Sequence, residues 1–348
     1  MSSVATRDLS QVARILEDVR ERGDTAVREW ALLLDGVEPA PATPDADTPA
    51  AAIEALAEAV RRWHALQRPV DVTLETAPGV ELSRRWVPLA SVGIYVPRGL
   101  VSTLVMCAVP AQVAGVERIV VATPPDGAGA VAAVARLLGV EEVWALGGPP
   151  AVAAFAYGTE LIRKVDKIVG PGNAYVNEAK LLVSREVAID LPAGPSEVVV
   201  LADAGTDGRI VELELAAQAE HGADAVCRHL VLDEDPDRAL SKVEALAPEH
   251  LVLLGERSEA LADRVRNAGA VFVGPWSAVA AGDYATGGNH VLPTGGWARA
   301  VGGLGLETFL KPVTVQRITS DGLTRLRATV EELAEIEGLP AHALAVQR

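Results

Sequence analysis

The sequence predicts an α/β protein with more than one parallel-sheet domain, and two observations carry that prediction. From about residue 90 onward, short runs of β-branched residues alternate with alanine-rich helical runs, which is typical of parallel sheets whose strands are joined by helices. The chain has 348 residues, whereas single hydrophobic cores stop growing at ~250–300 residues. We therefore expect two Rossmann-like domains, preceded by a helical N-terminal segment and followed by a C-terminal tail.

The N-terminal segment is expected to be helical on both sides of a loop. Apolar residues recur at helical spacing over residues 8–35, with a break at Gly23-Asp24, and again over residues 51–67. Residues 38–50 contain four prolines. This stretch therefore predicts a loop or linker in which we expect no chemistry.

The strands and helices of the α/β region follow in chain order. The strand candidates of its first part are Ser91–Val96, Arg118–Thr123, Glu142–Leu146, Lys167–Val169, Val187–Asp190 and Val198–Leu201. Helices are expected between them, for example over Val131–Leu138 and Tyr175–Val183. After Leu201 a long helix is expected to reach about Ala225, followed by a strand (His250–Leu254), a helix (Ser258–Asn267) and a strand (Ala270–Val273).

The overall composition narrows the class of protein. Hydrophobic residues make up 49% of the chain and charged residues 22%, which supplies a packed core and excludes disorder throughout. The net charge of −16 argues against nucleic acid and anionic membranes as partners, because both attract basic proteins. The sequence has no apolar run of ~18 residues and no signal-peptide pattern. We therefore expect a soluble, cytoplasmic protein.

The cysteines and serines exclude two kinds of site. With only Cys107 and Cys227, neither a disulfide framework nor an all-cysteine metal site is expected. Ser196 lies between two predicted strands, where it could bind a substrate or shape a turn. The chain has no Gly-x-Ser-x-Gly elbow, so a hydrolase serine is disfavoured.

Ligand sites of parallel sheets lie outside the carboxyl ends of the strands, so candidate residues are expected in the segments that follow predicted strands. Gly170–Asn173 follows a strand and precedes a helix. A glycine-rich turn at a helix N-terminus can bind an anion or a cofactor. Taken alone, the same segment also fits an ordinary tight turn.

Several polar side chains together indicate a metal ion. Gln218 and His221 are three residues apart on the predicted long helix and share a face. Asp283 and His290 belong to a polar loop after an apolar strand. Each segment alone fits a surface histidine or a plain turn. Together, four N/O ligands for zinc or a similar divalent ion are available from Gln218, His221, Asp283 and His342.

Glu249 and His250 are a candidate pair for proton transfer. They are adjacent at the start of a predicted strand, and histidine titrates near neutral pH. A solvated loop end explains the same two residues about as well when this segment is considered alone.

As a set, these motifs resemble the histidinol dehydrogenase family, whose members are zinc- and NAD-dependent enzymes of histidine biosynthesis. The matching stretches occur in family order and cover most of the chain after residue 80. They are GIYVP (93–97), VDKIVGPGNAYVNEAK (165–180), IDLPAGPSEVVVLAD (189–203), QAEHGADA (218–225), APEHL (247–251), NAGAVFVGP (267–275), GDYATGGNHVLPTGGWAR (282–299) and EGLPAH (337–342).

The resemblance implies a role for each candidate residue. Zinc would be held by Gln218, His221, Asp283 and His342, and these ligands with His250 would also contact the substrate. Glu249 and His250 would be the acid/base pair. Further substrate contacts would come from Ser196, His290 and Glu337, and NAD contacts from Tyr95 and Asn173. The reaction implied is oxidation of L-histidinol through the aldehyde to L-histidine with two NAD.

The resemblance also implies a domain organisation and a homodimer with shared active sites. We expect a discontinuous catalytic domain over residues 1–94 and 203–298, an NAD domain over residues 95–202, and a dimer-swapped tail over residues 299–348. Glu337 and His342, in that tail, would complete the site of the partner subunit.

Three departures from the family pattern keep other functions open. Pro150 stands where the family usually has a glutamine that contacts NAD, and proline offers no donor. The loop after Tyr95 is short and carries Arg98, and only 28 residues separate His221 from His250. The alternatives are a related zinc/NAD-dependent dehydrogenase of another amino alcohol and a non-catalytic zinc-binding paralogue; a zinc hydrolase is less favoured.

Overall fold

The structure is a computed structural model that describes residues 9–45, 48–192 and 194–348. The chain divides into two compact units. The larger unit comprises the described residues up to Gln67 together with Leu89–Phe309, and the smaller unit comprises Arg68–Pro88 and Leu310–Arg348. Over the described ranges, no helix combines the length and the apolar character needed to cross a membrane. The predicted division at residues 94, 202 and 298 stays a prediction.

The N-terminal segment of the larger unit is helical, as predicted. Helices α1 (Ser10–Arg22) and α2 (Asp24–Asp35) are separated at Gly23, whose φ of 56° lies in the left-handed region that favours glycine. The predicted start at residue 8 lies outside the described residues. Helix α3 (Ala50–Ala65) follows the proline-rich stretch. That stretch is more than a loop, because its strand β1 (Ala40–Pro41) pairs antiparallel with the first sheet.

The predicted first parallel sheet is confirmed. Its strands are β4 (Ser91–Tyr95), β5 (Arg118–Thr123), β6 (Glu142–Ala145), β7 (Lys167–Val169) and β8 (Ala188–Ile189), and their order is β1-β6-β5-β4-β7-β8. Apart from β1, every neighbouring pair is parallel. The order along the sheet reverses direction between β4 and β7, which makes the carboxyl ends of these two strands the topological switch point.

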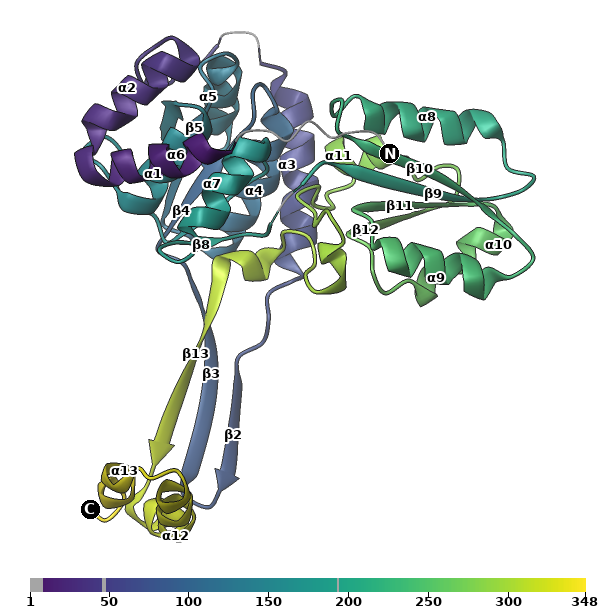
Figure 1. The fold of residues 1–348 in the computed structure, drawn as a ribbon. Helices are drawn as coiled ribbons and strands as arrows, with labels where there is room; N and C mark the ends of the chain where they lie inside the picture. Colours follow the sequence, from purple (N-terminus) through teal and green to yellow (C-terminus); the bar gives the residue numbers. More distant parts are fainter. Residues whose placement is uncertain (1–8, 46–47, 193) are drawn as a thin grey trace. The chain divides into compact units, whose positions relative to one another are not determined.

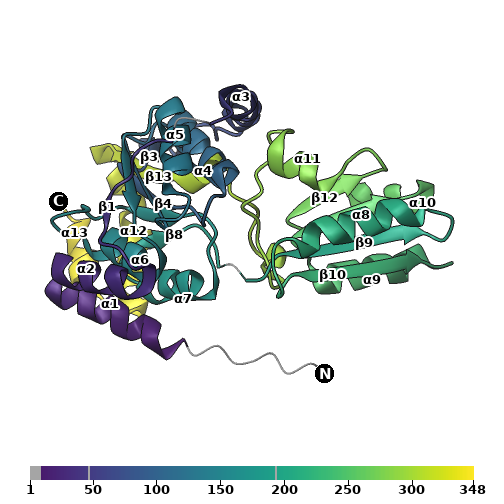
Figure 2. The ribbon, with the colours of Figure 1, turned by 90° about the horizontal axis from the view of Figure 1, so that it is seen from above.

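Helices cover both faces of the first sheet (Figure 2). Helices α4 (Val101–Ala114) and α5 (Ala128–Leu137) lie on one face with α3 outside them, and α6 (Gly148–Tyr157) and α7 (Ala174–Val183) lie on the other with α1 and α2 outside them. Buried apolar residues of α1, α2, α6 and α7 form one core cluster with this sheet. The sheet is therefore buried on both sides, which explains its nearly continuous apolar strands.

The second sheet is also parallel. Its strands are β9 (Glu197–Asp203), β10 (Val226–Leu232), β11 (His250–Leu254) and β12 (Ala270–Val273), in the order β10-β9-β11-β12. Helix α8 (Gly208–Ala219) covers one face, and α9 (Pro236–Leu246) and α10 (Glu256–Glu259) cover the other (Figure 1). A buried apolar cluster lies on each side of the sheet.

Two helices predicted near this sheet are wrong in extent. Helix α8 ends at Ala219, six residues before the predicted end near Ala225. The helix predicted over 258–267 is replaced by the one-turn α10 and a 3-10 turn at Ala262–Arg264. After β12 the larger unit ends with α11 (Val279–Tyr284) and the 3-10 turns Trp297–Arg299 and Leu306–Phe309.

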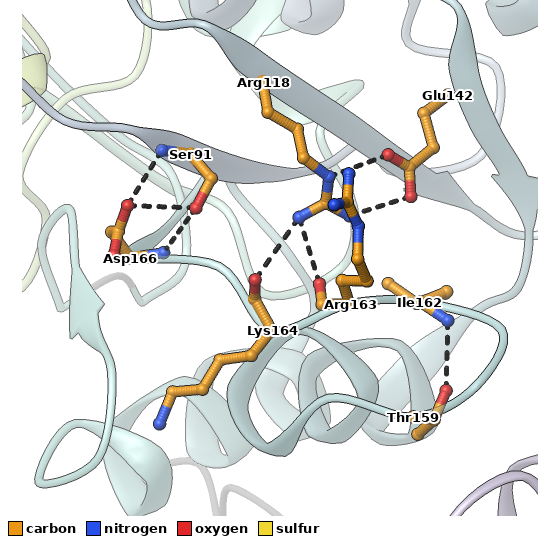
Figure 3. Close-up of polar contacts among 8 residues, drawn as sticks. All are labelled: Ser91, Arg118, Glu142, Thr159, Ile162, Arg163, Lys164 and Asp166. Atoms are coloured by element: carbon orange, nitrogen blue, oxygen red, sulfur yellow. Dashed lines mark hydrogen bonds and ion pairs between the residues drawn. The ribbon is translucent and has the colours of Figure 1, made fainter.

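The amino edge of the first sheet is occupied by structural hydrogen bonds (Figure 3). Arg118, at the start of β5, donates from Nε and Nη2 to the two carboxylate oxygens of Glu142, at 2.9 and 2.8 Å, and from Nη1 to the Arg163 carbonyl at 3.1 Å. Ser91, at the start of β4, donates from N and Oγ to Asp166 at 2.8 and 3.0 Å. Side-chain hydrogen bonds thus tie the strands together at this edge.

The smaller unit joins two distant parts of the chain. Its antiparallel sheet has the order β13-β3-β2, with β2 (Val72–Ala77), β3 (Val80–Pro88) and β13 (Leu310–Ile318). Helices α12 (Ser320–Ile336) and α13 (Pro340–Ala345) follow β13. In Figure 1 they lie at the end of the strands where the β2–β3 turn is found. These strands are absent from the elements expected from the sequence.

Candidate active site

The centre of the candidate site is the carboxylate of Glu249, at the start of β11. Ser196 Oγ donates to Glu249 Oε2 at 2.6 Å, and the backbone N–H of Glu197 donates to the same oxygen at 2.7 Å. Strands β9 and β11 are paired neighbours with His250 opposite Val198, so the residues just before the two strands meet. Burial raises the pKa of Glu249 to about 8, although the hydrogen bonds from Ser196 and Glu197 act in the opposite direction.

The next residue, His250, is a buried neutral imidazole. Its Nδ1 lies 3.1 Å from the Glu197 carbonyl oxygen, and because a carbonyl only accepts, Nδ1 carries the proton. Nε2 is therefore the atom with the free lone pair, and it is buried with no hydrogen-bond partner among the described residues. Burial lowers the pKa of His250 to about 4. At neutral pH the imidazole is therefore unprotonated, with the lone pair of Nε2 unoccupied.

Gln218 extends the hydrogen-bond chain from Glu249. It lies in the last turn of α8, is 2% exposed, and donates from Nε2 to Ser196 Oγ at 2.6 Å. Its Oε1 is buried and has no partner in the described part of the chain. His221 lies beyond the end of α8 rather than on it, and its backbone N–H donates to the Gln218 carbonyl at 3.1 Å.

Asp283 and His221 are electrostatic neighbours in this region. Asp283 lies on α11, where burial raises its pKa to about 6 while the charge of His221 lowers it. His221 also lowers the pKa of His250, secondarily to burial. The structure therefore brings Gln218, His221 and Asp283, predicted as metal ligands, to the same part of the molecule as Glu249 and His250.

His290 connects this region to the first sheet's helices. Its Nδ1 lies 3.2 Å from the Asp283 carbonyl oxygen, and its Nε2 lies 3.4 Å from Thr103 Oγ1 in the first turn of α4. Burial lowers the pKa of His290 to about 4. Asn289 holds the same loop by donating to the Met106 carbonyl of α4 at 2.7 Å.

The candidate cofactor residues lie at the switch point of the first sheet. Tyr95 ends β4, and Gly170–Asn173 connects β7 to α7. The Tyr95 hydroxyl is buried and accepts from the Gly148 N–H at 3.1 Å. Asn173 is exposed, and its side chain accepts from the N–H groups of Tyr175 and Val176 at 3.0 and 3.1 Å. The position at the switch point fits a nucleotide cofactor.

Two residues that depart from the family pattern, Pro150 and Arg98, follow strands of the first sheet. Pro150 is buried in the first turn of α6, where it offers neither a side-chain donor nor an N–H. Arg98 is mostly exposed, and its Nη1 lies 3.0 Å from Asp126 Oδ2.

The larger unit contains only three of the four predicted zinc ligands, Gln218, His221 and Asp283. No group of three or more His, Cys, Asp or Glu side chains capable of holding a metal occurs among the residues that the structure describes. The buried Gln218 Oε1 nevertheless has no hydrogen-bond partner among the described residues, as expected of an atom that binds a metal ion. Oxygen and imidazole donors also suit zinc. The fourth predicted ligand, His342, and Glu337 belong to the smaller unit and are both exposed.

The sequence did not single out two residues near this site. Thr103 contacts His290 and is buried, and Glu214 is a buried carboxyl one turn before Gln218 on α8. Burial raises the pKa of Glu214, whose Oε2 accepts from the Val279 N–H of α11 at 3.2 Å. The i, i+4 spacing of Glu214 and Gln218 would have placed both on one helix face, whereas Thr103 carries no such signal.

In the second sheet the candidate residues lie at the amino ends of the strands, where the sequence also places Glu249 and His250. Ser196, Glu249 and His250 lie at the amino ends of β9 and β11. At the carboxyl end of β9, Asp203 accepts from the N–H groups of Arg257 and Ser258 at 2.9 and 3.0 Å.

Comparison with known proteins gives consistent matches over nearly the whole chain. A family model described as Histidinol dehydrogenase matches residues 2–235 and 227–348. The histidinol dehydrogenase of Methanothermobacter thermautotrophicus is 42% identical over 396 residues, which cover 98% of this chain and 93% of that protein. The enzyme of the same name from Yersinia pestis is 39% identical, with 99% and 90% covered. A crystal structure of histidinol dehydrogenase from Elizabethkingia anophelis has a TM-score of 0.88 and 34% identity, covering 97% of this chain and 90% of that one.

The comparisons also locate where this chain is short. The alignment with the Methanothermobacter protein is 396 residues long, which exceeds the 348 residues of this chain. The two stretches matched by the family model overlap at residues 227–235. That overlap covers most of β10 and the connection to α9, between His221 and His250, where the sequence analysis found a short segment.

Proposed function

Because the chain belongs to the histidinol dehydrogenase family, we propose that it oxidises L-histidinol to L-histidine with two NAD, as an enzyme of histidine biosynthesis in the cytoplasm. The observation that carries this proposal is the buried pair Glu249 and His250, one beside the other, at the end of the hydrogen-bond chain from Gln218. Their two altered pKa values suit the two different proton transfers that the reaction requires.

The first oxidation needs a base for the hydroxyl proton of the alcohol. Hydride leaves the carbinol carbon for NAD as this proton is removed, and the aldehyde forms. His250 is suited to this role because its Nδ1 is held by the Glu197 carbonyl and its Nε2 is free. The low pKa of about 4 keeps the imidazole unprotonated before each turnover.

The second oxidation needs a water molecule. Adding water to the aldehyde gives a hydrate, which loses hydride to a second NAD and protons to solvent, leaving the carboxylate. Glu249 is the candidate that takes a proton from the water. Its pKa of about 8 makes the ionised carboxylate a stronger base than an ordinary glutamate, and Ser196 and Glu197 hold it in place by hydrogen bonds.

A zinc ion would be held by Gln218, His221 and Asp283, with His342 completing the set. When bound, zinc supplies a positive centre that orients the imidazole and amine of histidinol and stabilises negative charge on oxygen. Ser196, His290 and Glu337 would contact the rest of the substrate. The support for zinc is the free Gln218 Oε1 and the neighbouring charges of His221 and Asp283.

NAD would bind at the carboxyl edge of the first sheet, against Tyr95 and Asn173. The support is the topological switch between β4 and β7 and the glycine-rich turn before α7. Pro150 provides no donor there, so the affinity for NAD rests on backbone groups and the remaining side chains.

We further propose a homodimer in which Glu337 and His342 of one copy complete the site of the other. Both residues are exposed. They lie among exposed apolar side chains of α12 and α13, including Leu333, Ile336 and Leu344. An exposed apolar group of this kind is typical of a surface covered by a second subunit.

One assay tests the function. Purified protein is mixed with NAD and L-histidinol, and NADH absorbance is followed with and without a chelator. We expect two NADH per histidinol, loss of activity on chelation and recovery with added zinc. Turnover of other amino alcohols only would favour a related dehydrogenase, for which the altered Pro150 and Arg98 positions provide the reason. Zinc binding without turnover of any alcohol would favour a non-catalytic paralogue and contradict the proposal.

A further inference from the structure

The hydroxyl group of Ser196 lies between a candidate metal ligand and a candidate base. Its oxygen is 2.6 Å from Gln218 Nε2 on one side and 2.6 Å from Glu249 Oε2 on the other. Gln218 and Glu249 are both almost completely buried, at 2% and 6% exposure. Because these two partners are shielded from solvent, the direction of each hydrogen bond matters.

The direction of the two hydrogen bonds follows from counting protons. A serine hydroxyl has one proton, and in the structure Ser196 Oγ donates it to Glu249 Oε2 at 2.6 Å. Glu249 Oε2 also receives the Glu197 N–H at 2.7 Å. Because this proton is directed to Glu249, the Ser196 oxygen must accept from Gln218, and only the NH₂ end of the amide can donate. The amide is thereby locked with Nε2 toward Ser196 and Oε1 away from it.

This orientation decides which atom of Gln218 is available to a metal. An amide nitrogen has no free lone pair and does not bind zinc, whereas the amide oxygen does. The freed Oε1 is the buried atom that has no hydrogen-bond partner in the described residues. A rotation of the amide by half a turn would present NH₂ to the metal and abolish this ligand.

We propose that Ser196 is a positioning residue for the metal site: it fixes the Gln218 amide so that Oε1 faces the ion, and it uses its only proton on Glu249. This inference rests on the proposed metal site. It goes beyond a substrate contact, because a hydroxyl whose proton is already donated can only accept from the substrate, and because its principal effect is on metal affinity.

The first test measures metal affinity rather than turnover. Zinc is removed from the protein, and the dissociation constant for added zinc is determined by competition with a chromophoric chelator. We expect Ser196→Ala to weaken zinc binding about 10- to 100-fold, the range typical of residues that orient a metal ligand. Ser196→Thr keeps the hydroxyl and should stay within about threefold of wild type. Ser241→Ala, which removes an exposed hydroxyl on α9, is the matched control and should have no effect.

The second test replaces Gln218 by a residue whose side-chain orientation does not affect metal binding. In Gln218→Glu both side-chain oxygens can bind zinc, so either orientation of the group serves. Ser196→Ala should then change the zinc dissociation constant by less than about threefold in the Gln218→Glu background, against the 10- to 100-fold change in the wild-type background. The melting temperature of each zinc-free variant reports whether it is folded.

The outcomes separate this inference from the proposed function. If wild type binds zinc and Ser196→Ala binds it equally well, the role of Ser196 is wrong and the metal site stands. An equal loss in both Gln218 and Gln218→Glu backgrounds would also overturn it, since orientation would not be the cause. If wild type binds no zinc, the metal site itself is wrong, and the role of Ser196 with it. Should Ser196→Ala fail to fold, a Ser196→Thr variant with tenfold weaker binding would contradict the proposal.

Discussion

Lys180 Nζ lies 2.5 Å from Asp190 Oδ1, and both side chains are almost completely buried. The same ammonium donates to the Gly170 carbonyl at 2.8 Å, and the Gly170 N–H donates to Asp190 Oδ2 at 2.7 Å. The ion pair therefore holds both polar groups of Gly170, at the start of the turn between β7 and α7. Neither residue had been singled out from the sequence as part of the cofactor region.

We expect loss of either member of this pair to destabilise the protein strongly. Lys180→Met or Asp190→Asn leaves one buried group without its partner, which costs about 3–5 kcal/mol of unfolding free energy. The double variant should cost less than the sum, because no charge remains unpaired. Urea denaturation measures these values. The exposed pair Arg238–Asp233 is the control, for which Arg238→Met should leave the unfolding free energy nearly unchanged. Strictly additive losses would contradict this account.

His250→Ala should remove turnover and leave the metal in place. The imidazole is the proposed base, and general-base catalysis typically contributes about 10²- to 10⁴-fold to the rate. We expect kcat with histidinol to fall by that factor while zinc content, measured by atomic emission, stays at the wild-type level. His229→Ala on β10 is the control, because His229 is exposed and lies in the same sheet. Loss of zinc together with turnover would instead place His250 among the ligands.

The pH dependence of stability tests the burial of Glu249. Its pKa is raised from 4.5 to about 8, so the folded protein binds this proton more tightly than the unfolded chain does. Its contribution to stability is therefore complete below pH 4.5 and is lost as pH rises through about 8. Glu249→Gln cannot ionise and should avoid this loss.

The useful window for that experiment lies above pH 6.5. The pKa values of His250 and His290 are lowered from 6.5, so these two residues reduce the stability of the folded protein only below pH 6.5. Between about pH 6.5 and 8.5, the zinc-free Glu249→Gln variant should gain on wild type by about 2 kcal/mol in unfolding free energy. Glu212→Gln, at an exposed position of α8, should give a curve parallel to wild type. If the Glu249→Gln curve is parallel as well, Glu249 is not buried as described.

Mixing two inactive variants tests the shared site. His250→Ala and His342→Ala each damage one part of it, and a mixed dimer would contain one site with both residues intact. Partial recovery of histidinol oxidation after subunit exchange is expected, up to about a quarter of the wild-type rate per subunit for random exchange with one intact site in each mixed dimer. Exchange is verified with differently tagged copies. Verified exchange without recovery would contradict the contribution of His342 to a neighbouring site.

Much of the larger unit could be predicted from local pattern. The apolar strands β4, β5 and β7 and the break at Gly23 follow from periodicity and glycine chemistry that act over a few residues. The end of α8 was not predicted correctly. The helix was expected to continue through residues 220–225, whereas the chain turns there in the structure.

The smaller unit was not predicted because its signal is non-local. Strand β3 is only partly buried, and its neighbours are β2 nearby and β13 more than 200 residues later. In the site, motifs indicated Glu249 and His250 directly, whereas the contact of Thr103 with His290 depends on packing between distant segments. Neither pairing leaves a pattern within a short window of sequence.

The pairing of β3 with β13 sets an order for folding during synthesis. Leu82 is opposite Gln316, so the ribosome must complete nearly the whole polypeptide before this sheet can close. Until then the β2–β3 hairpin has an open edge, and an isolated two-stranded hairpin is marginally stable in water. The larger unit's sheets need no residue beyond Phe309, so they can form first. A nascent chain released early would thus carry its assembled α/β core together with an unpaired strand edge, the kind of surface that chaperones protect from aggregation.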